Sequence, residues 1–405
     1  MNIVVFGHLP SWAGGRQESG LANVIYQLAK HCSNLRGSDV TLVATDSFVQ
    51  ERKDGNLRIV GWTKSLLIGY MLKHPIHALR SVFRLFELKK KYPMKERFQG
   101  LLLKRIFFER SIRSLKSDII HLHGPSAIWY LDLVPDEVKV AVTFHGMIGL
   151  DVNVEQHEVL YKIERDVFHS DKVDEFFFIC TQLVPSFINT YGDNGKKNRV
   201  IFNSYDNTQF YYNKEEISSL RLDDVAEEQG KVTRLYTVAS LSELKGQARV
   251  LSGLTLLQDT KKFKYYCIGA DSYGISDNLK DYAHENDISF EYLGKKKPSE
   301  IRREMAKADY MIMPSSSEGF GLTYLEAIAC GVPVILPKNI PIAAEKELIN
   351  EKNSILLDDC SVESIAKVLE NIDKWKFNRE EVANSISGFS WDEMARQYVG
   401  AFEQL

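Results

Sequence analysis

One stretch of the sequence decides the fold: Pro314-Ser-Ser-Ser-Glu-Gly-Phe-Gly-Leu-Thr-Tyr-Leu-Glu-Ala-Ile-Ala-Cys-Gly-Val-Pro-Val-Ile335. The residues that lead into it, Ala308 to Pro314, are predicted to form a strand. Leu322 to Cys330 are predicted to form a helix that ends at Gly331, in the left-handed conformation that glycine adopts easily. A strand that passes through a glycine-rich loop into a helix is the repeating unit of parallel α/β sheets.

The loop in this stretch has the composition of a ligand site. Gly319 and Gly321 allow the backbone to approach a ligand closely, and the helix start behind them offers unpaired N–H groups and a positive dipole end to an anion. Glu318 lies in the loop and Glu326 on the helix, and a carboxylate accepts hydrogen bonds from neighbouring hydroxyl groups. We therefore expect a sugar and its phosphate here. For Glu326 a solvated helix charge is the alternative.

The bulk composition indicates a globular protein of two domains. The chain has 405 residues, which exceeds one ordinary core, and 44% of them are hydrophobic. No apolar run approaches the roughly 20 residues that span a bilayer. Met1 to Gly7 reads as a strand without a signal-peptide pattern, so we expect a cytoplasmic protein. Widely spaced cysteines in apolar contexts indicate neither disulfides nor a zinc site: Cys32, Cys180, Cys267, Cys330 and Cys360.

Short apolar runs alternate with helical patterns along the whole chain, as in doubly wound parallel sheets. In the first half these runs are Ile3 to Phe6, Val40 to Ala44, Ile119 to Leu122, Val140 to Phe144, Phe176 to Cys180 and Val200 to Phe202. After a polar bridge they resume with Leu235 to Ser240, Tyr265 to Gly269, Phe290 to Leu293, Tyr310 to Pro314 and Val332 to Leu336. Functional residues are expected in the loops after these strands, because such sheets bind ligands beyond the strand carboxyl ends.

The spacing Glu318-x7-Glu326, inside Ser-Ser-x-Glu-Gly-Phe-Gly-Leu-x-x-Leu-Glu-Ala-x-Ala-x-Gly-x-Pro-Val-Ile, resembles the retaining glycosyltransferases of family 4. The resemblance implies the GT-B fold, in which two Rossmann-like doubly wound parallel-sheet domains face each other across a cleft. Residues 1–205 would form the acceptor-binding domain and residues 206–388 the nucleotide-sugar-binding domain. The helix at 389–405 would cross back onto the first domain. The alternative is a core helix of the second domain.

The same resemblance implies a set of donor-binding residues. Lys245, in Tyr236-Thr-Val-Ala-Ser-Leu-Ser-Glu-Leu-Lys-Gly, matches a lysine that binds the diphosphate, whereas Ser240 stands where an arginine is usual. Serine gives one neutral donor in place of a charged fork, and a lysine from Lys295-Lys-Lys297 is a candidate to compensate. Gly14 and Gly15 resemble the first glycine-rich loop of the family. The implied donor-binding residues are Gly15, Ser240, Lys245, Gly294, Lys295, Glu318, Gly319, Phe320, Gly321, Leu322 and Glu326.

Histidines end two strands of the first half. His145, in Thr143-Phe-His-Gly, matches the family position near the anomeric carbon of the transferred sugar. His121 and His123 are interpreted as structural or acceptor-side residues, since no further acid or cysteine lies at metal-ligand spacing. The implied catalytic residues are Glu318, His145 and Lys245. No metal or other cofactor is expected, because Lys245 and the helix dipole would stabilise the leaving group and no Asp-x-Asp motif is apparent.

A basic segment from Lys73 to Lys116 holds thirteen Lys and Arg against three Glu, a net charge of +10 in a chain whose total is −3. These charges are interleaved with Leu, Ile, Phe and Tyr at 78–91 and 101–110, a pattern that suits the anionic surface of a membrane. A solvated helix pair packed on the domain is one alternative. A nucleic-acid surface is another, but no nucleic-acid-binding module accompanies the charge.

The resemblance thus implies retaining transfer of a sugar from a nucleotide-diphosphate donor, with a UDP-sugar favoured over GDP-mannose. The acceptor would be a hydroxyl of a glycan or a lipid-linked molecule in cell-surface polysaccharide or glycolipid synthesis, at the inner face of the membrane. Two alternatives remain. One is a degenerate GT-B protein that only binds a sugar nucleotide or a partner, for which Ser240 is the argument. The other is an epimerase or a glycogen-synthase-like elongase on the same fold.

Overall fold

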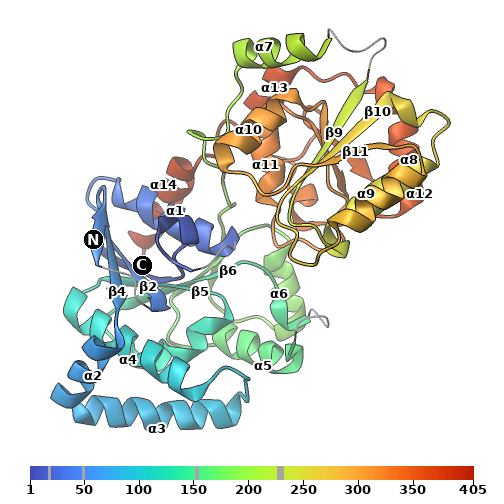
Figure 1. Ribbon diagram of the computed structural model, residues 1–405. Coiled ribbons are helices and arrows are strands. Elements are labelled where there is room, and N and C mark those ends of the chain that lie inside the picture. Colours follow the sequence, from blue (N-terminus) through green and yellow to red (C-terminus); the bar gives the residue numbers. More distant parts are fainter. Residues whose placement is uncertain (17–19, 48–50, 151–154, 226–231) are drawn as a thin grey trace. The chain divides into compact units, whose positions relative to one another are not determined.

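The computed structural model describes residues 1–16, 20–47, 51–150, 155–225 and 232–405, and shows two α/β units (Figure 1). The first comprises Met1–Asn203 together with Trp391–Leu405, and the second comprises Ser204–Ser390. The chain therefore leaves the first unit two residues before the expected boundary and returns to it two residues after the expected start of the last segment.

The first unit contains an eight-stranded sheet in the order β3-β4-β2-β1-β5-β6-β7-β8. Neighbouring strands are parallel except β3 and β4, which are antiparallel. The strand order reverses at β1, which has β2 on one side and β5 on the other; ligands bind such sheets at this kind of switch point. The strands are β1 Asn2–Gly7, β2 Asp39–Ser47, β3 Arg52–Asp54, β4 Leu57–Trp62, β5 Ile119–His123, β6 Lys139–Phe144, β7 Glu175–Phe178 and β8 Lys197–Val200.

Helices cover this sheet. They are α1 Gly20–Ser33, α2 Lys64–Lys73, α3 Pro75–Lys91, α4 Phe98–Leu115, α5 His157–Phe168 and α6 Leu183–Tyr191. The α4 helix is largely buried, because Phe107 and Phe108 have no exposed surface and Arg105 donates to the Asp132 carboxylate at 2.8 Å. The expectation that residues 101–110 present an apolar face to a membrane is therefore wrong, since that face is part of the core.

The last helix, α14 (Trp391–Phe402), packs on α1 of the first unit. Its buried face holds Trp391, Met394, Tyr398 and Phe402, the residues that helical spacing placed together. Specific contacts fix it there: Asp392 Oδ1 lies 2.6 Å from His31 Nδ1, and the Tyr398 hydroxyl lies 3.1 Å from Thr143 Oγ1. The sequence was equally compatible with a core helix of the second unit, and only these tertiary contacts distinguish the two possibilities.

The second unit contains a six-stranded parallel sheet in the order β11-β10-β9-β12-β13-β14. The order reverses between β9 and β12, which pair directly, so the switch point lies there. Its strands are β9 Thr233–Val238, β10 Phe263–Ile268, β11 Ser289–Tyr292, β12 Tyr310–Ile312, β13 Val334–Pro337 and β14 Ser354–Leu357. Its helices are α7 Lys214–Val225, α8 Gln247–Thr255, α9 Ser276–Glu285, α10 Pro298–Lys307, α11 Leu322–Ala329, α12 Val362–Glu370 and α13 Arg379–Asn384.

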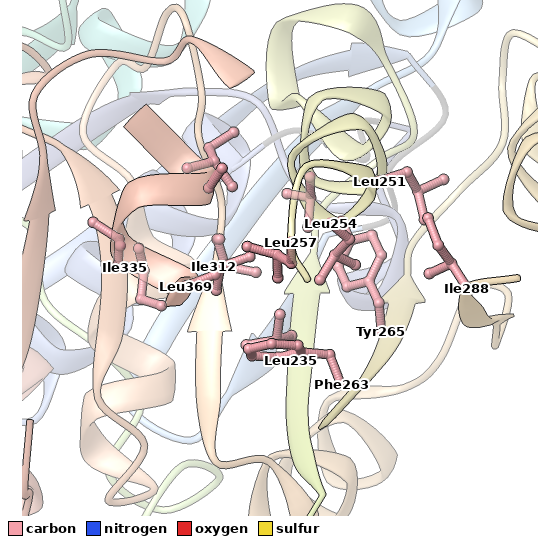
Figure 2. Close-up of a cluster of buried hydrophobic side chains, with 14 of the residues drawn as sticks. Leu235, Leu251, Leu254, Leu257, Phe263, Tyr265, Ile288, Ile312, Ile335 and Leu369 are labelled. Atoms are coloured by element: carbon pink, nitrogen blue, oxygen red, sulfur yellow. The ribbon is translucent and has the colours of Figure 1, made fainter. Parts of the chain in front are cut away.

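Strands and helices of the second unit share one apolar core (Figure 2). Leu235 of β9 and Ile312 of β12 lie on the sheet, while Leu254 of α8 and Leu369 of α12 cover it. Burying each such side chain stabilises the fold by about 1.5–3 kcal/mol. This packing makes the central strands a rigid base for the loops that follow them.

Three strands were not predicted, and one was displaced. The missed strands are β3, β4 and β14, and β8 lies at Lys197–Val200 rather than at Val200–Phe202. The charged residues of β8 prevented its prediction as a strand. They are tolerated because β8 is an edge strand and Arg199 lies 2.8 Å from the buried carboxylate of Glu175. None of the described helices combines the length and the apolar composition needed to cross a membrane.

Candidate active site

The loops that follow β9 and β12 bring Lys245 and Glu318 together at the switch point of the second sheet. Lys245 ends a short 3₁₀ turn, Glu243–Lys245, and its Nζ lies 2.6 Å from Glu318 Oε1. The same carboxylate oxygen accepts a hydrogen bond from Ser315 Oγ at 2.8 Å. The side chain of Glu318 is 8% exposed and that of Lys245 27%, so this ion pair is partly shielded from water.

Backbone contacts hold the two loops against each other. Ser316 N donates to Leu244 O at 2.9 Å, and Arg249 Nη2 donates to Pro314 O at 2.8 Å. Gly246 adopts a left-handed φ of 79°, and a Cβ there would lie 2.7 Å from Pro314 O. The glycine therefore permits the close approach that places the lysine beside the glutamate.

The helix α11 begins directly after this loop. Its N-cap is Gly321, with φ 95°, and no side chain caps the first turn. A Cβ on Gly321 would lie 2.6 Å from the ring of Tyr324, whose hydroxyl donates to Met313 O at 2.7 Å. The first N–H groups of the helix therefore lack a side-chain acceptor, which is the local structure that binds anions. Beside them Gly319 is exposed and Phe320 is buried.

Glu326 lies one turn along α11 and is partly buried. Burial, together with the negative charge of Asp206, raises its pKa to about 7. Asp206 is itself engaged in a turn, where its carboxylate accepts hydrogen bonds from Thr208 and Gln209. Glu326 is therefore an acid that changes charge near neutral pH rather than a simple solvated helix carboxylate.

The loops after β10 and β11 complete this edge of the sheet. Gly269 N donates to Gly294 O at 3.0 Å, and a Cβ on Gly269 would overlap the Ala239 carbonyl oxygen. Ser240 is exposed, and its carbonyl accepts a hydrogen bond from Gln247 Nε2 at 3.2 Å. Gly294 has a φ of 71° and is followed by Lys295. Ser240 and Gly294 therefore belong to loops that are tied together at the same end of the strands as Lys245.

The other two lysines of the 295–297 run have local roles. Lys296 Nζ lies 3.7 Å from Glu304, and the Lys297 N–H donates to Glu300 at the start of α10. The Lys296 side chain and the Lys297 backbone therefore both contact α10.

The switch point of the first unit carries a cluster of histidines. His123 Nδ1 lies 3.0 Å from His145 Nε2, and His8 Nδ1 lies 2.8 Å from Thr45 Oγ1. Burial lowers the pKa of His145 to about 4 and that of His123 well below its usual range, where His121, His145 and His8 add to the effect. The paired imidazoles are therefore neutral at physiological pH, with one ring nitrogen donating to the other.

His121 has a structural role. It has no exposed surface, and its Nε2 lies 2.7 Å from Thr143 Oγ1, which also contacts the Tyr398 hydroxyl of α14. Burial, with a smaller effect of His145, lowers the His121 pKa to about 3. Of the two interpretations that the sequence left open, the contacts of His121 support the structural one, whereas His123 contacts His145.

The first glycine-rich loop is shaped by its own packing. A Cβ on Gly15 would overlap the carbonyl oxygen of Leu9, and Gly15 N donates to Pro10 O at 2.9 Å. Glycine at this position is therefore required by the loop itself, whatever ligand lies nearby. The loop presents Trp12, 62% exposed, edge-on to the buried ring of Tyr26 at 5.1 Å.

Sequence reasoning missed two residues that support Glu318. Ser315 donates to its carboxylate, and Arg249 holds its loop through Pro314 O. The Ser-Ser-Ser run before Glu318 was a usable signal for Ser315, but nothing in the sequence pairs Arg249 with a carbonyl 65 residues away. Among the described residues no group of three or more His, Cys, Asp or Glu is arranged to hold a metal ion.

Two family models match consecutive parts of the chain. The model described as Glycosyltransferase Family 4 matches residues 19–209, and the model described as Glycosyl transferases group 1 matches residues 221–385. Together with the two parallel-sheet units, these matches show that the chain belongs to the family 4 glycosyltransferases and has the GT-B fold.

Individual proteins show the same likeness. The O-antigen biosynthesis glycosyltransferase WclY of Escherichia coli is 28% identical over 174 residues, 41% of this chain and 45% of that protein. The sucrose-phosphate synthase of Thermosynechococcus elongatus has a TM-score of 0.71 at 15% identity, over 100% of this chain and 98% of that one. Anabaena HepE, in complex with UDP-glucose, has a TM-score of 0.69 at 15% identity over 100% of both chains. The chain spans about half the length of the curated relatives it matches.

Proposed function

We propose that this protein transfers a sugar, with retention of anomeric configuration, from a nucleotide-diphosphate donor to a hydroxyl group. The observation that carries the proposal is the Lys245–Glu318 pair beside the uncapped start of α11, at the switch point of the second sheet. A lysine and free helix N–H groups suit a diphosphate, and a carboxylate beside them suits the hydroxyls of the attached sugar. Membership of family 4 supports the reaction class.

Each candidate residue then has one role. Lys245 and the first turn of α11 stabilise the departing diphosphate, Glu318 orients the transferred sugar, and Glu326 accepts hydrogen bonds from the ribose. His145 is neutral, so its imidazole can lie near the positive charge that develops at the anomeric carbon without repelling it. No residue acts as a nucleophile in this proposal.

The bond changes occur on one face of the sugar. The bond from the anomeric carbon to the phosphate oxygen breaks, and a bond from the acceptor oxygen to that carbon forms on the same face. The proton of the acceptor hydroxyl passes to the departing phosphate, which serves as the base. We propose that this reaction needs no metal, because Lys245 and α11 supply the positive electrostatics that an ion would otherwise supply.

For the donor we favour a UDP-sugar, with GDP-mannose as the second choice. The HepE structure of the same fold contains UDP-glucose, which supports this order. For the acceptor we favour a glycan or a lipid-linked molecule in cell-surface polysaccharide or glycolipid synthesis, which the name of the O-antigen relative supports. Such an acceptor would be met at an anionic membrane surface on the cytoplasmic side.

A protein that binds a sugar nucleotide without transferring the sugar is the second candidate. Ser240 favours it, because an exposed neutral serine replaces the arginine expected at this position and weakens the hold on the leaving group. The Lys245–Glu318 geometry favours the enzyme, and measurement of product formation separates the two.

A thermal-shift panel of UDP-, GDP- and ADP-sugars tests the proposal, because a ligand that binds the native state raises its apparent stability. We expect a UDP-sugar to raise the midpoint and Lys245→Ala to remove most of that rise. Release of UDP from the bound donor, as hydrolysis or transfer, identifies an enzyme. A shift without any UDP release identifies the binding protein, and no shift with any nucleotide sugar contradicts both readings.

A further inference from the structure

An exposed apolar stripe runs along α3 and the end of α2. Leu72 is 78% exposed, Ile76 and Leu79 are each 68% exposed, Phe83 is 71% exposed and Phe86 is 66% exposed. Within α3 the spacing of three, four and three residues places the last four on one side of the helix, and Leu72 lies at the end of α2. Large apolar side chains normally appear on a protein surface singly, so a continuous row of them indicates a surface that binds something.

The stripe belongs to an outer helix that is anchored from beneath. The opposite face of α3 is buried through Ser81, Leu85 and Leu88, and Ser81 Oγ donates to Glu109 of α4 at 3.1 Å. Figure 1 shows α3 running along the outer side of α4. The helix is therefore held with its apolar stripe directed away from the core of the unit.

Part of the positive charge in the basic segment is neutralised within the protein. Lys91 lies 2.8 Å from Asp166, Lys104 lies 2.8 Å from Glu96, and Arg105 lies 2.8 Å from Asp132. In the part of the chain that the structure describes, no carboxylate lies within ion-pair distance of three exposed cations, Lys73, Arg80 and Lys90. Lys90 lies one turn beyond Phe86 on the same side of α3.

We infer that the stripe on α2 and α3 inserts into the headgroup region of an anionic lipid bilayer, with Lys73, Arg80 and Lys90 on the lipid phosphates. The inference rests on the proposed function and specifies where that function meets the membrane. Unpaired cations beside an apolar row match a surface that is negative outside and apolar beneath. Binding then combines insertion of the apolar side chains with attraction of these cations to the lipid phosphates.

The same spacing is compatible with a second copy of the chain, because a row at alternating intervals of four and three residues is also a helix-pairing seam. The unpaired cations disfavour that occupant, since two copies would place like charges near each other. The experiment below therefore includes the oligomeric state.

Co-sedimentation with vesicles tests the inference. The probes are vesicles of phosphatidylcholine alone and of phosphatidylcholine mixed with phosphatidylglycerol, at about 0.1 M and about 0.5 M NaCl. We expect binding to the mixed vesicles, with a part that survives the higher salt because inserted apolar groups are not screened. The double variant Phe83→Ser, Phe86→Ser should lose about tenfold or more in partitioning at both salt concentrations.

Matched variants separate insertion from charge. Arg80→Glu with Lys90→Glu should reduce binding at low salt several-fold and change the salt-resistant part little. Tyr273→Ser and Lys352→Glu, at exposed positions of the second unit, should change nothing. A tryptophan placed by Phe86→Trp should be quenched by lipids with brominated tails, whereas one placed by Tyr273→Trp should not.

Three outcomes would overturn the inference: no binding of the wild type to mixed vesicles, full binding by the double serine variant, or a dimer that this variant converts to a monomer. The vesicles contain no acceptor, and the same proteins are also tested for a thermal shift with UDP-sugars. If the wild type does not bind the mixed vesicles but keeps its nucleotide shift, the membrane inference alone is refuted. If it binds the vesicles but shows no nucleotide shift, the proposed donor site alone is refuted.

Discussion

Lys245 Nζ lies 2.6 Å from Glu318 Oε1, although the two residues are 73 positions apart in the sequence. The loops after β9 and β12 form this contact at the point where the strand order of the second sheet reverses. Each group neutralises the other in the free protein. A nucleotide-diphosphate sugar offers a better partner to each of them, since its phosphates are anionic and its sugar hydroxyls donate hydrogen bonds.

Replacement of either member should therefore reduce sugar transfer strongly. Glu318→Ala and Lys245→Ala are each expected to lower kcat by about 100-fold or more, because each removes an interaction with the transferred sugar or the leaving group. Thermal unfolding of both variants should remain cooperative, since neither residue is part of the apolar core. Wild-type transfer rates in either folded variant would refute the assignment.

Replacing Ser240 by arginine is expected to strengthen the binding of UDP. Ser240→Arg should tighten UDP binding by about tenfold, since a guanidinium adds a charged fork near the diphosphate. Titration calorimetry with UDP measures the effect, and Ser242→Arg in the same loop is the control for added charge. Equal affinities of the Ser240→Arg variant and the wild type would show that this position does not meet the leaving group.

The carboxyl group of Glu326 predicts a pH dependence of donor binding. Because its pKa is raised to about 7, the carboxylate that accepts ribose hydroxyls is mostly protonated at pH 6 and mostly ionised at pH 8. Affinity for UDP should therefore rise by about tenfold between these two pH values. The variant Glu326→Gln should show a flat profile over the same range, and a wild-type profile that is equally flat would contradict the role.

The same shift has a consequence for the stability of the free protein. The folded state binds the Glu326 proton more tightly than the unfolded state, so this group favours folding below pH 4.5. That contribution is lost as the pH rises through about 7. Chemical denaturation at pH 6 and pH 8, compared with Glu326→Gln, isolates it.

Sugar transfer is predicted to be independent of metal ions. Transfer should persist in excess EDTA, because the proposed leaving-group stabilisation comes from Lys245 and the start of α11. The measurement is the rate of UDP release before and after chelation. Activity that EDTA abolishes and Mn²⁺ restores would show that a metal ion takes part.

The α/β class and the candidate donor residues could be read from the sequence, because both are encoded locally. Apolar runs alternate with helical patterns, and the string around Glu318 and Glu326 keeps a strand, a glycine loop and a helix within 28 residues. The strand β3 was missed because all three of its residues are charged, and β4 because Arg58 and Gly61 interrupt its apolar pattern. The apolar run of β14, Ile355 to Leu357, is only three residues long. Burial of these strands depends on neighbours in the sheet that no local window contains.

The helices α3 and α4 show where local information ends. Both carry apolar and basic residues with helical spacing, and from the sequence both were expected to face a membrane. In the structure α4 lies in the core, with Arg105 neutralised by Asp132, while α3 keeps an exposed apolar stripe. Periodicity shows that a helix has an apolar side, but not whether another element covers it.

By itself, the sequence determined the fold class, the two-domain organisation and the residue types of the candidate site, since these follow from short-range patterns. Only the tertiary structure decided that Lys245 meets Glu318, that His123 meets His145 and that α14 packs on the first unit. Each of these contacts joins residues that different strands or helices bring together, so their energies depend on long-range packing. Contacts between residues that are tens of positions apart leave no periodic pattern in the sequence, so these contacts could not be predicted from it.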